Sequence, residues 1–242
     1  MNFSLEIGLK TGLNNLPKVK NVYITLLPGE DFRQVVNKAK ELTNLGFNPV
    51  PHFPARSIKN LNNLKDYVKR CKDDGVKQAL VIGGSAQPIG DFHCSLQLLE
   101  TGLFEGFKIG IAGHPDGSPD ISDTDLEKAM IDKKSYADYI ITQWLLETDP
   151  IIKFISRQTL PVHVGITGPL TIASLLKFAN IVGAKNSLNF IKSNMTKAFD
   201  LLKPRDPNDI IEKLKSSTEN FHIYTFGGLQ ETNKWLAENN YV

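Results

Sequence analysis

The sequence predicts an α/β protein folded as a (β/α)8 TIM barrel, and three observations lead to this prediction. Eight short apolar runs rich in β-branched residues recur along the chain, and longer amphipathic runs separate them. Neighbouring parallel strands need a crossover between them, usually a helix, so this alternation favours a parallel sheet. Eight such units fit a closed barrel better than an open sheet, and a length of 242 residues is typical of that barrel.

The expected elements can be placed in order along the chain. The apolar runs predict strands at residues 3–7, 22–27, 49–53, 78–82, 107–112, 139–143, 162–166 and 221–226. The amphipathic runs predict helices at residues 31–45, 58–73, 92–101, 122–135, 149–157, 169–180, 184–202, 207–217 and 229–238.

An extra helix is expected after the seventh strand. The segment from Gly168 to Leu214 holds more helical pattern than one crossover needs, and Pro204 and Pro207 predict a turn between two helices. No linker rich in proline, glycine or serine divides the chain, so residues 1–242 are expected to form one domain.

The composition excludes several classes of protein. With 41% hydrophobic and 22% charged residues, the chain can bury a large core, which argues against disorder. The 28 lysines and arginines and the 26 acidic residues give a net charge of +2, and the basic residues are scattered. No nucleic-acid partner is therefore expected.

The two cysteines and the apolar runs give further exclusions. Cys71 and Cys94 have neither the spacing of a metal site nor the number needed for a disulfide framework, so no metal is expected. No apolar run is long enough to span a membrane, and the N-terminus has no signal-peptide core. These observations predict a cytoplasmic protein without a membrane partner.

Glu6 is the candidate catalytic residue. It lies inside the first expected strand between Leu5 and Ile7, and the active site of this barrel lies at the C-terminal ends of the strands. A carboxylate that points into a barrel is costly to bury unless it is used or paired. Burial would raise its pKa and suit it to proton transfer. The alternative is a glutamate near the chain start that points to solvent, and the residues alone leave both open.

Polar residues at the ends of the other expected strands are candidate binding residues. They are Thr25, His52, the turn Gly83-Gly84-Ser85, the loop residues His114, Asp116 and Ser118, and Gln143. In the glycine turn, backbone amides can approach a ligand closely. The Gln143 amide can both donate and accept hydrogen bonds. The loops after the seventh and eighth strands carry no lysine or arginine, so a phosphate there would rest on backbone amides.

The remaining histidines are interpreted as structural. His93 falls in a helical region, His163 lies inside the seventh strand, and His222 lies in the eighth. We interpret all three as packing residues or as hydrogen-bonding residues at the rim, and Cys71 as a small apolar residue of an amphipathic helix.

The ordered set of strand ends resembles the methylenetetrahydrofolate reductase family. The residues that carry the resemblance are Ser4-Leu5-Glu6, Thr25, Pro51-His52, Ala112-Gly113-His114-Pro115-Asp116-Gly117-Ser118-Pro119, Ile141-Thr142-Gln143 and Phe221-His222-Ile223-Tyr224-Thr225. No single motif is diagnostic, but the order of the set is fairly specific and covers nearly the whole chain.

The resemblance implies a flavin-dependent barrel that reduces 5,10-methylenetetrahydrofolate to 5-methyltetrahydrofolate, with NADH or NADPH as the donor. Glu6 matches the acid that helps to open the methylene bridge of this tetrahydrofolate derivative. The matches to FAD contacts are Thr25, His52, Gly84, Ser85, His114 and Ser118. Gln143 matches an amide that binds the pterin, and Gly228 matches a position that contacts the folate tail.

The sequence departs from the family pattern at three positions. Ser85 stands where the reductases usually carry an aspartate, and Gly228 replaces an arginine. Asp132 aligns with the lysine that binds the flavin phosphate, with Lys133 and Lys134 next to it.

The departures leave other functions open. A flavin-free relative on the same barrel could be a tetrahydrofolate-dependent methyltransferase or demethylase, with Glu6 again handling the proton. A third alternative is a folate-binding protein without catalysis, in which Glu6 is unnecessary. A homo-oligomer is compatible with the sequence, although no interface signature is visible in it.

Overall fold

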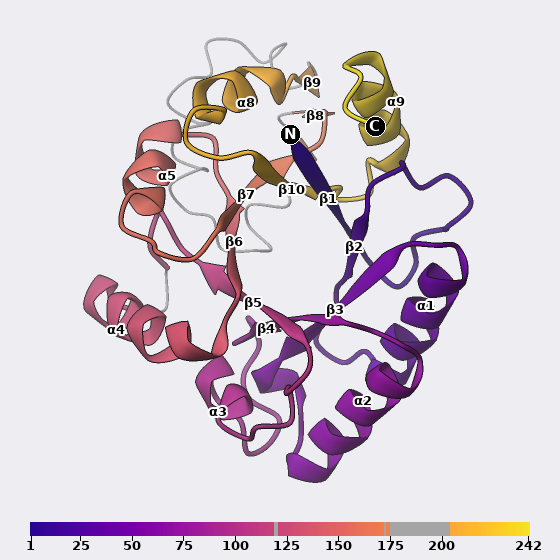
Figure 1. Cartoon of the computed structure of the whole chain (residues 1–242), viewed down its shortest axis with the longest axis vertical. Coiled ribbons are helices and arrows are strands. Elements are labelled where there is room, and N and C mark those ends of the chain that lie inside the picture. The colour runs from indigo at the N-terminus through magenta and orange to yellow at the C-terminus, as the bar shows by residue number, and fades with distance from the viewer. Residues whose placement is uncertain (119–120, 172, 175–203) are drawn as a thin grey trace.

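The computed structural model is a closed barrel of parallel strands, which confirms the expected fold class. The structure describes residues 1–118, 121–171, 173–174 and 204–242. The strand order around the barrel is β1-β10-β7-β6-β5-β4-β3-β2. Each neighbouring pair is parallel, and β1 closes the ring by pairing with both β2 and β10 (Figure 1).

The eight expected strands are all present. They are β1 (Asn2–Ile7), β2 (Asn21–Ile24), β3 (Asn48–Pro54), β4 (Gln78–Ile82), β5 (Lys108–Gly113), β6 (Tyr139–Trp144), β7 (Val162–Thr167) and β10 (Asn220–Tyr224). The strand β2 ends at Ile24, earlier than the expected residue 27. Two further strands, β8 (Leu170–Thr171) and β9 (Pro204–Arg205), form a separate antiparallel pair.

Helices surround the ring of strands (Figure 1). They are α1 (Phe32–Asn44), α2 (Leu61–Asp73), α3 (Ser95–Leu99), α4 (Asp123–Lys133), α5 (Thr148–Ile155), α8 (Asn208–Leu214) and α9 (Leu229–Glu238), with 3-10 turns η1 (Ala55–Ser57) and η2 (Lys134–Tyr136). The side chains of Asp31, Asn60 and Ser122 each accept a hydrogen bond from a backbone N–H in the first turn of the helix that follows. The Asn60 cap places the start of α2 at Leu61, later than the expected residue 58.

The helix expected at residues 169–180 does not begin where the pattern placed it. Leu170 and Thr171 form β8 instead. The Thr171 hydroxyl accepts a hydrogen bond from the N–H of Ser174, which is the geometry of a helix cap and shows that Thr171 precedes the helical turn. The rest of that expected helix, apart from residues 173–174, and the extra helix expected at residues 184–202 lie outside the described residues.

The main hydrophobic core lies between the strands and the helices. Alternate strand residues such as Leu5, Val22 and Ile223 face this layer and are fully buried. The opposite face of the strands lines the barrel interior. There a small separate apolar cluster contains Tyr23, Val50, Leu80, Tyr139 and Ile141. Because the outer layer contains most of the apolar packing, the inner face can carry polar groups.

Candidate functional site

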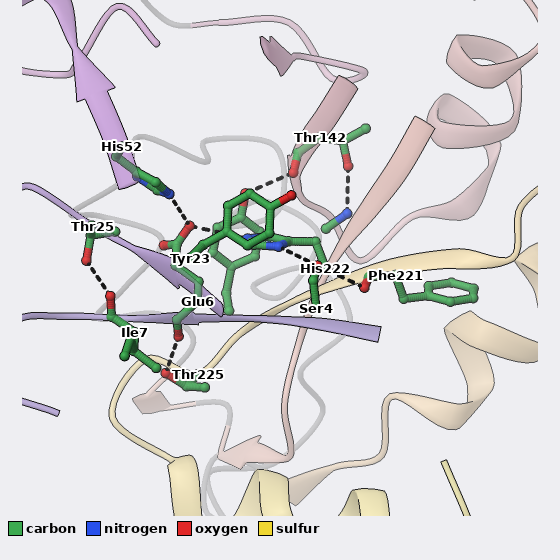
Figure 2. A network of polar contacts seen from close by, with 12 residues as sticks. Ser4, Glu6, Ile7, Tyr23, Thr25, His52, Thr142, Phe221, His222 and Thr225 are labelled. Atoms are coloured by element: carbon green, nitrogen blue, oxygen red, sulfur yellow. Dashed lines mark hydrogen bonds and ion pairs between the residues drawn. The ribbon is translucent and has the colours of Figure 1, made fainter. Parts of the chain in front are cut away.

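The Glu6 carboxylate lies inside the barrel between two imidazole rings. Its Oε2 atom is 3.3 Å from Nε2 of His222 and 3.4 Å from Nε2 of His52. Figure 2 shows the two rings on either side of the carboxylate. The Glu6 side chain is 15% exposed. The sequence left open whether Glu6 points into the barrel or to solvent, and in the structure it points into the barrel.

His222 is held on its other side by Ser4. The His222 side chain is 0% exposed, and its Nδ1 atom lies 2.9 Å from Oγ of Ser4 (Figure 2). The Ser4 hydroxyl also donates to the carbonyl oxygen of Phe221 at 3.4 Å. The interpretation of His222 as a packing or rim residue missed its contact with Glu6. In the pairing of β1 with β10, His222 lies opposite Ser4, and Tyr224 lies opposite Glu6. This pairing arises only when the barrel closes.

His52 faces the same carboxylate from β3. Its side chain is buried, and its Nε2 atom has no hydrogen-bond partner among the described residues, although it lies within ion-pair distance of Glu6. The Tyr67 hydroxyl donates to the backbone carbonyl of His52 and fixes this part of the strand. The structure thus directs the Nε2 atom of His52 toward Glu6.

The two histidines change the ionisation of Glu6. Burial raises the pKa of the Glu6 carboxyl, but the nearby His52 and the hydrogen bond with His222 lower it, and the net pKa lies below the ordinary value. The expectation of a raised pKa was wrong, because it considered burial without these partners. Burial lowers the pKa of His52 below that of an ordinary histidine. In the ligand-free protein Glu6 is therefore a carboxylate at neutral pH.

Tyrosines fill the barrel interior around this group. The Tyr23 hydroxyl donates to the Tyr139 hydroxyl at 3.0 Å, and the Tyr224 hydroxyl donates to the carbonyl oxygen of Thr142 at 2.9 Å. The ring of Tyr23 lies edge-on to that of His222, with centroids 4.5 Å apart. Burial raises the pKa of Tyr23, Tyr139 and Tyr224, so all three remain neutral donors.

Two glycines on the inner face make room for these rings. A Cβ atom at Gly110 would lie 2.6 Å from the ring of Tyr139, and one at Gly165 would lie 2.7 Å from the ring of Tyr224. A larger residue at Gly110 would displace the Tyr139 ring, and one at Gly165 would clash with the backbone carbonyl of Thr142 as well as with the Tyr224 ring.

Several of the candidate rim residues support the backbone of the site. The Thr25 hydroxyl donates to the carbonyl oxygen of Ile7, and the Thr225 hydroxyl donates to that of Glu6, both at 2.9 Å (Figure 2). These two bonds fix the C-terminal end of β1. The Gln143 side chain donates to the carbonyl oxygen of Gly117 at 3.3 Å and so joins β6 to the loop after β5.

The turn after β4 contains the glycines at which the sequence predicted a close approach of backbone amides to a ligand. Gly84 has a φ of +89°, in the left-handed region that favours glycine, and Arg56 donates to its carbonyl oxygen at 3.3 Å. Ser85 next to it is exposed. In the loop after β5, His114 and Ser118 are half-buried.

Gly228 is packed too tightly to carry a side chain. Its Cβ would lie 2.9 Å from Cδ2 of Leu170, and its N–H donates to the carbonyl oxygen of Thr225 at 2.7 Å. An arginine in this position would require the Leu170 side chain to move.

Lys133 is a buried cation beside the loop after β5. It is 8% exposed, whereas Asp132 and Lys134 on either side of it are exposed. No described residue forms a hydrogen bond or an ion pair with its ammonium group. Burial lowers the pKa of Lys133, and burial together with Lys133 lowers the pKa of His114 to about 4. Helix α4 therefore presents Lys133, and not Asp132, to the interior.

The described residues contain neither a candidate metal site nor a candidate membrane-spanning helix. They contain no group of three or more histidine, cysteine, aspartate or glutamate side chains that could hold a metal ion. In the same part of the chain, no helix has the length and apolar character needed to cross a membrane.

Comparisons with known proteins identify relatives in sequence. The family model of methylenetetrahydrofolate reductase matches residues 29–231. The methylenetetrahydrofolate reductase (NADH) 1 of Arabidopsis thaliana is 26% identical over an alignment of 163 positions, and the match covers 56% of this chain. The match covers 26% of the Arabidopsis protein, so the similarity spans about a quarter of that relative's length.

Solved structures share the fold at low sequence identity. An uncharacterized protein from Clostridium thermocellum that binds two copies of 5-methyl-5,6,7,8-tetrahydrofolic acid has a TM-score of 0.64 at 13% identity. That match covers 99% of this chain and 95% of the other. Oxaloacetate acetylhydrolase has a TM-score of 0.55 at 11% identity, covering 93% of this chain and 74% of that one. At these identities the similarity establishes the fold alone.

Proposed function

The chain belongs to the methylenetetrahydrofolate reductase family, and from this premise we propose that it reduces 5,10-methylenetetrahydrofolate to 5-methyltetrahydrofolate, with Glu6 as the proton donor. The observation that carries the proposal is the Glu6 carboxylate inside the barrel, in contact with His52 and His222. Opening the methylene bridge breaks a carbon–nitrogen bond and leaves negative charge on the departing nitrogen. Glu6, a carboxylate in the ligand-free protein, would take up a proton from solvent when substrate binds and deliver it to this nitrogen. A positioned general acid of this kind accelerates a reaction by about 10²- to 10⁴-fold.

The C-terminal mouth of the barrel offers groups that suit a reduced folate. Gln143 is half-buried at the end of β6, and its amide can donate to and accept from the pterin edge. Tyr224 is half-buried on the inner face of β10, near Glu6. The folate-binding protein of Clostridium thermocellum with the same fold supports this choice of ligand class.

The residues of the rim also fit an anionic cofactor such as FAD. Lys133, buried and without an ion-pair partner among the described residues, would bind a phosphate of the cofactor, and the amides of the turn at Gly84 would approach the flavin. His114 and Ser118, in the loop after β5, are further candidate contacts. Thr25 and Ser85 would lie at the edge of the site, and His52 would lie next to Glu6. When bound, the flavin supplies the hydride that it receives from NADH or NADPH.

A second candidate function is methyl transfer to or from tetrahydrofolate without a flavin. It is favoured by the uncharged, exposed Ser85 in the turn after β4 and by the absence of a side chain at Gly228. In transfer from methyltetrahydrofolate Glu6 would protonate the departing nitrogen, and in transfer to tetrahydrofolate its carboxylate would accept the proton that this nitrogen loses.

An absorption spectrum of the purified protein, taken after incubation with FAD and removal of the excess, separates the two functions. Retained flavin that is bleached by NADH or NADPH, and restored by methylenetetrahydrofolate, is the result expected for the reductase. A colourless protein that binds tetrahydrofolate by calorimetry would rule out reduction and favour methyl transfer. A protein that binds neither FAD nor tetrahydrofolate would overturn both.

A further inference from the structure

We propose that Trp144 is a folate-binding residue, and that its indole N–H donates a hydrogen bond to an oxygen of the bound pterin once the turn at Phe226 opens. The inference deepens the proposed function, because it rests on a folate bound beside Glu6. It gives a role to a tryptophan at the C-terminal end of β6 that the sequence pattern did not single out.

The indole N–H of Trp144 is a buried donor without an acceptor. Trp144 is 2% exposed, and its Nε1 atom has no hydrogen-bond partner among the described residues. Leaving a buried donor unpaired is costly, so proteins rarely do so without a reason. The other tryptophan, Trp235, has the ordinary arrangement, since its Nε1 atom donates to Oδ1 of Asn208 at 3.3 Å. The Trp144 N–H is therefore a donor that a ligand can satisfy.

A bulge in β6 turns the Trp144 side chain toward the barrel interior. Side chains alternate between the two faces of a strand, so a residue three positions after the inward-facing Ile141 would face outward in a regular strand. In the pairing of β6 with β7, Ile141 lies opposite His163. Trp144 lies opposite Gly165, so two residues of β6 between these pairs lie against one of β7. His163 and Gly165 share a face of β7, and Trp144 therefore faces the interior.

Aromatic rings connect Trp144 to the surroundings of Glu6. The centroid of the Phe226 ring lies 6.1 Å from that of Trp144 and 5.7 Å from that of Tyr224. Tyr224 lies opposite Glu6 in the pairing of β1 with β10. Gly165 makes room for the Tyr224 ring, because a Cβ atom there would lie 2.7 Å from it. A planar ligand that reaches Glu6 therefore lies next to these rings.

The pterin of a folate is the ligand group that suits this position. Gln143, the proposed partner of the pterin edge, directly precedes Trp144 on β6. Glu6 would deliver its proton to the same ligand. The residues proposed for FAD, Lys133 and Gly84, lie instead in α4 and in the turn after β4. An indole N–H can only donate, and the ring carbonyl of a pterin is an acceptor that matches it.

The turn after β10 is built so that the Phe226 ring can move away from Trp144. Phe226 has a φ of +45° and Gly227 a φ of +85°, both positive as in a type I′ turn. The N–H of Gly228 closes this turn on the carbonyl oxygen of Thr225 at 2.7 Å. A left-handed conformation strains a phenylalanine but not a glycine. A type II turn needs a positive φ only at the position of Gly227, so rotation of Phe226 to a negative φ removes the strain and keeps the turn hydrogen bond.

Nitrogen-15 NMR of the tryptophan side chains in the full chain tests the contact. The chain has two tryptophans, so protein labelled with ¹⁵N-tryptophan gives two indole signals, which Trp235→Phe assigns. On titration with 5-methyltetrahydrofolate, we expect the Trp144 indole proton to shift downfield and to exchange more slowly with solvent, because it gains an acceptor. Trp235 is the internal control and should not change, since its N–H already has an acceptor. A Trp144 signal that is unchanged when calorimetry shows saturation, or that responds to FAD alone, would overturn the proposal.

Two variants test the donor and the ring that covers it. Trp144→Phe keeps an aromatic ring without the N–H, so the Kd for 5-methyltetrahydrofolate should rise by roughly tenfold, whereas Trp235→Phe should leave it unchanged. Phe226→Ala should make the Trp144 indole proton of the ligand-free protein exchange faster with solvent. Wild-type affinity in Trp144→Phe would overturn the donor role, and wild-type exchange in Phe226→Ala would overturn the role of the turn. The NMR titration of the wild-type chain decides the donor role even if a variant fails to fold.

The outcomes separate this inference from the proposed function. If the Trp144 signal responds to 5-methyltetrahydrofolate in a protein without reductase turnover, the contact stands and the reductase proposal fails. If turnover is present and the Trp144 signal is unchanged at saturation, the contact fails and the reductase proposal stands. A protein that binds no folate would overturn both.

Discussion

The inner and outer faces of the barrel strands carry different kinds of residue. On β1, Leu5 is fully buried against the helical layer, whereas its neighbour Glu6 points into the barrel with His52 and His222. The outer layer contains the main apolar core, while the interior combines a few apolar residues with tyrosines, histidines and the Glu6 carboxylate. Substitutions of adjacent residues on one strand should therefore affect different properties of the protein. Substitutions of the polar groups around Glu6 on the inner face should change the reaction, and truncations on the outer face should change the stability.

Glu6→Gln should give the largest effect on the reaction. Without an acid, we expect kcat to fall by about 10²- to 10⁴-fold while the free energy of unfolding changes little, since the amide can keep a hydrogen bond to His222. Steady-state turnover of methylenetetrahydrofolate and urea denaturation of the same preparation measure the two quantities. A variant with full activity would show that Glu6 takes no part in proton transfer.

Leu5→Ala, one position earlier, should give the opposite result. Leu5 is fully buried in the outer core, so its truncation should lower the free energy of unfolding by about 3 kcal/mol. The turnover of each folded molecule should remain that of the wild type. If Leu5→Ala lost activity while remaining stable, the assignment of the two faces would be wrong.

Gly110→Ala tests whether the interior tolerates extra volume. The added Cβ would lie 2.6 Å from the ring of Tyr139, so we expect a loss of about 2 kcal/mol in the free energy of unfolding and disturbance of the Tyr23–Tyr139 hydrogen bond. Gly12→Ala is the control, since no atom lies within 4 Å of a Cβ there. Equal stabilities of the two variants in thermal melts would indicate that Tyr139 has room to move.

Lys133→Met tests whether the buried ammonium group of Lys133 contacts the cofactor. If the unpaired ammonium binds a phosphate, the affinity for FAD should fall by roughly tenfold, because one charge-assisted contact is lost. Lys134→Met changes the exposed neighbour and should leave the affinity unchanged. Titration of the flavin fluorescence measures both. Equal affinities in the two variants would mean that Lys133 does not contact the cofactor.

His163 gives the smallest expected effect, on stability at acid pH. Burial, with His222 and Lys108, lowers the pKa of His163 to about 4, below the unfolded value of about 6.5. As the pH falls through 6.5, the unfolded chain takes up this proton first, so the folded state loses stability. For this half-buried ring we expect a loss of about 1 kcal/mol between pH 7 and pH 5.

The variant His163→Gln should therefore lose less stability than the wild type over the same interval. His93→Gln, which changes an exposed histidine, is the matched control and should follow the wild type. Denaturant titrations at pH 7 and pH 5 supply the comparison. A His163→Gln protein as sensitive to pH as the wild type would place this ring in solvent.

Local patterns in the sequence were enough to find the barrel strands and one essential feature of the site. The strand β4 was placed to the residue, as was the helix α9, because each is bounded by clear changes of pattern. Glu6 was singled out because a carboxylate between Leu5 and Ile7 in an apolar strand is unusual. The start of the helix after Thr171 was misplaced, since a cap by a threonine side chain leaves little trace in the apolar pattern.

The partners of Glu6 could not be identified in the same way. His222 lies 216 positions from Glu6 along the chain, and nothing in its own segment distinguishes it from a packing residue. Likewise, the alignment at Asp132 suggested a carboxylate toward the cofactor, whereas the rotation of α4 buries Lys133 and exposes Asp132. A shift of one residue on a helix changes the direction of a side chain by about 100°.

The sequence by itself determined the fold class, because the alternation of strand patterns with helix patterns is visible in each short segment of the chain. Only the tertiary structure decided that Ser4, Glu6, His52 and His222 meet, and that the pKa of Glu6 is lowered and not raised. Both depend on the register in which β1 closes the ring against β10, and on the charges that this closure brings within a few ångströms of a buried carboxylate.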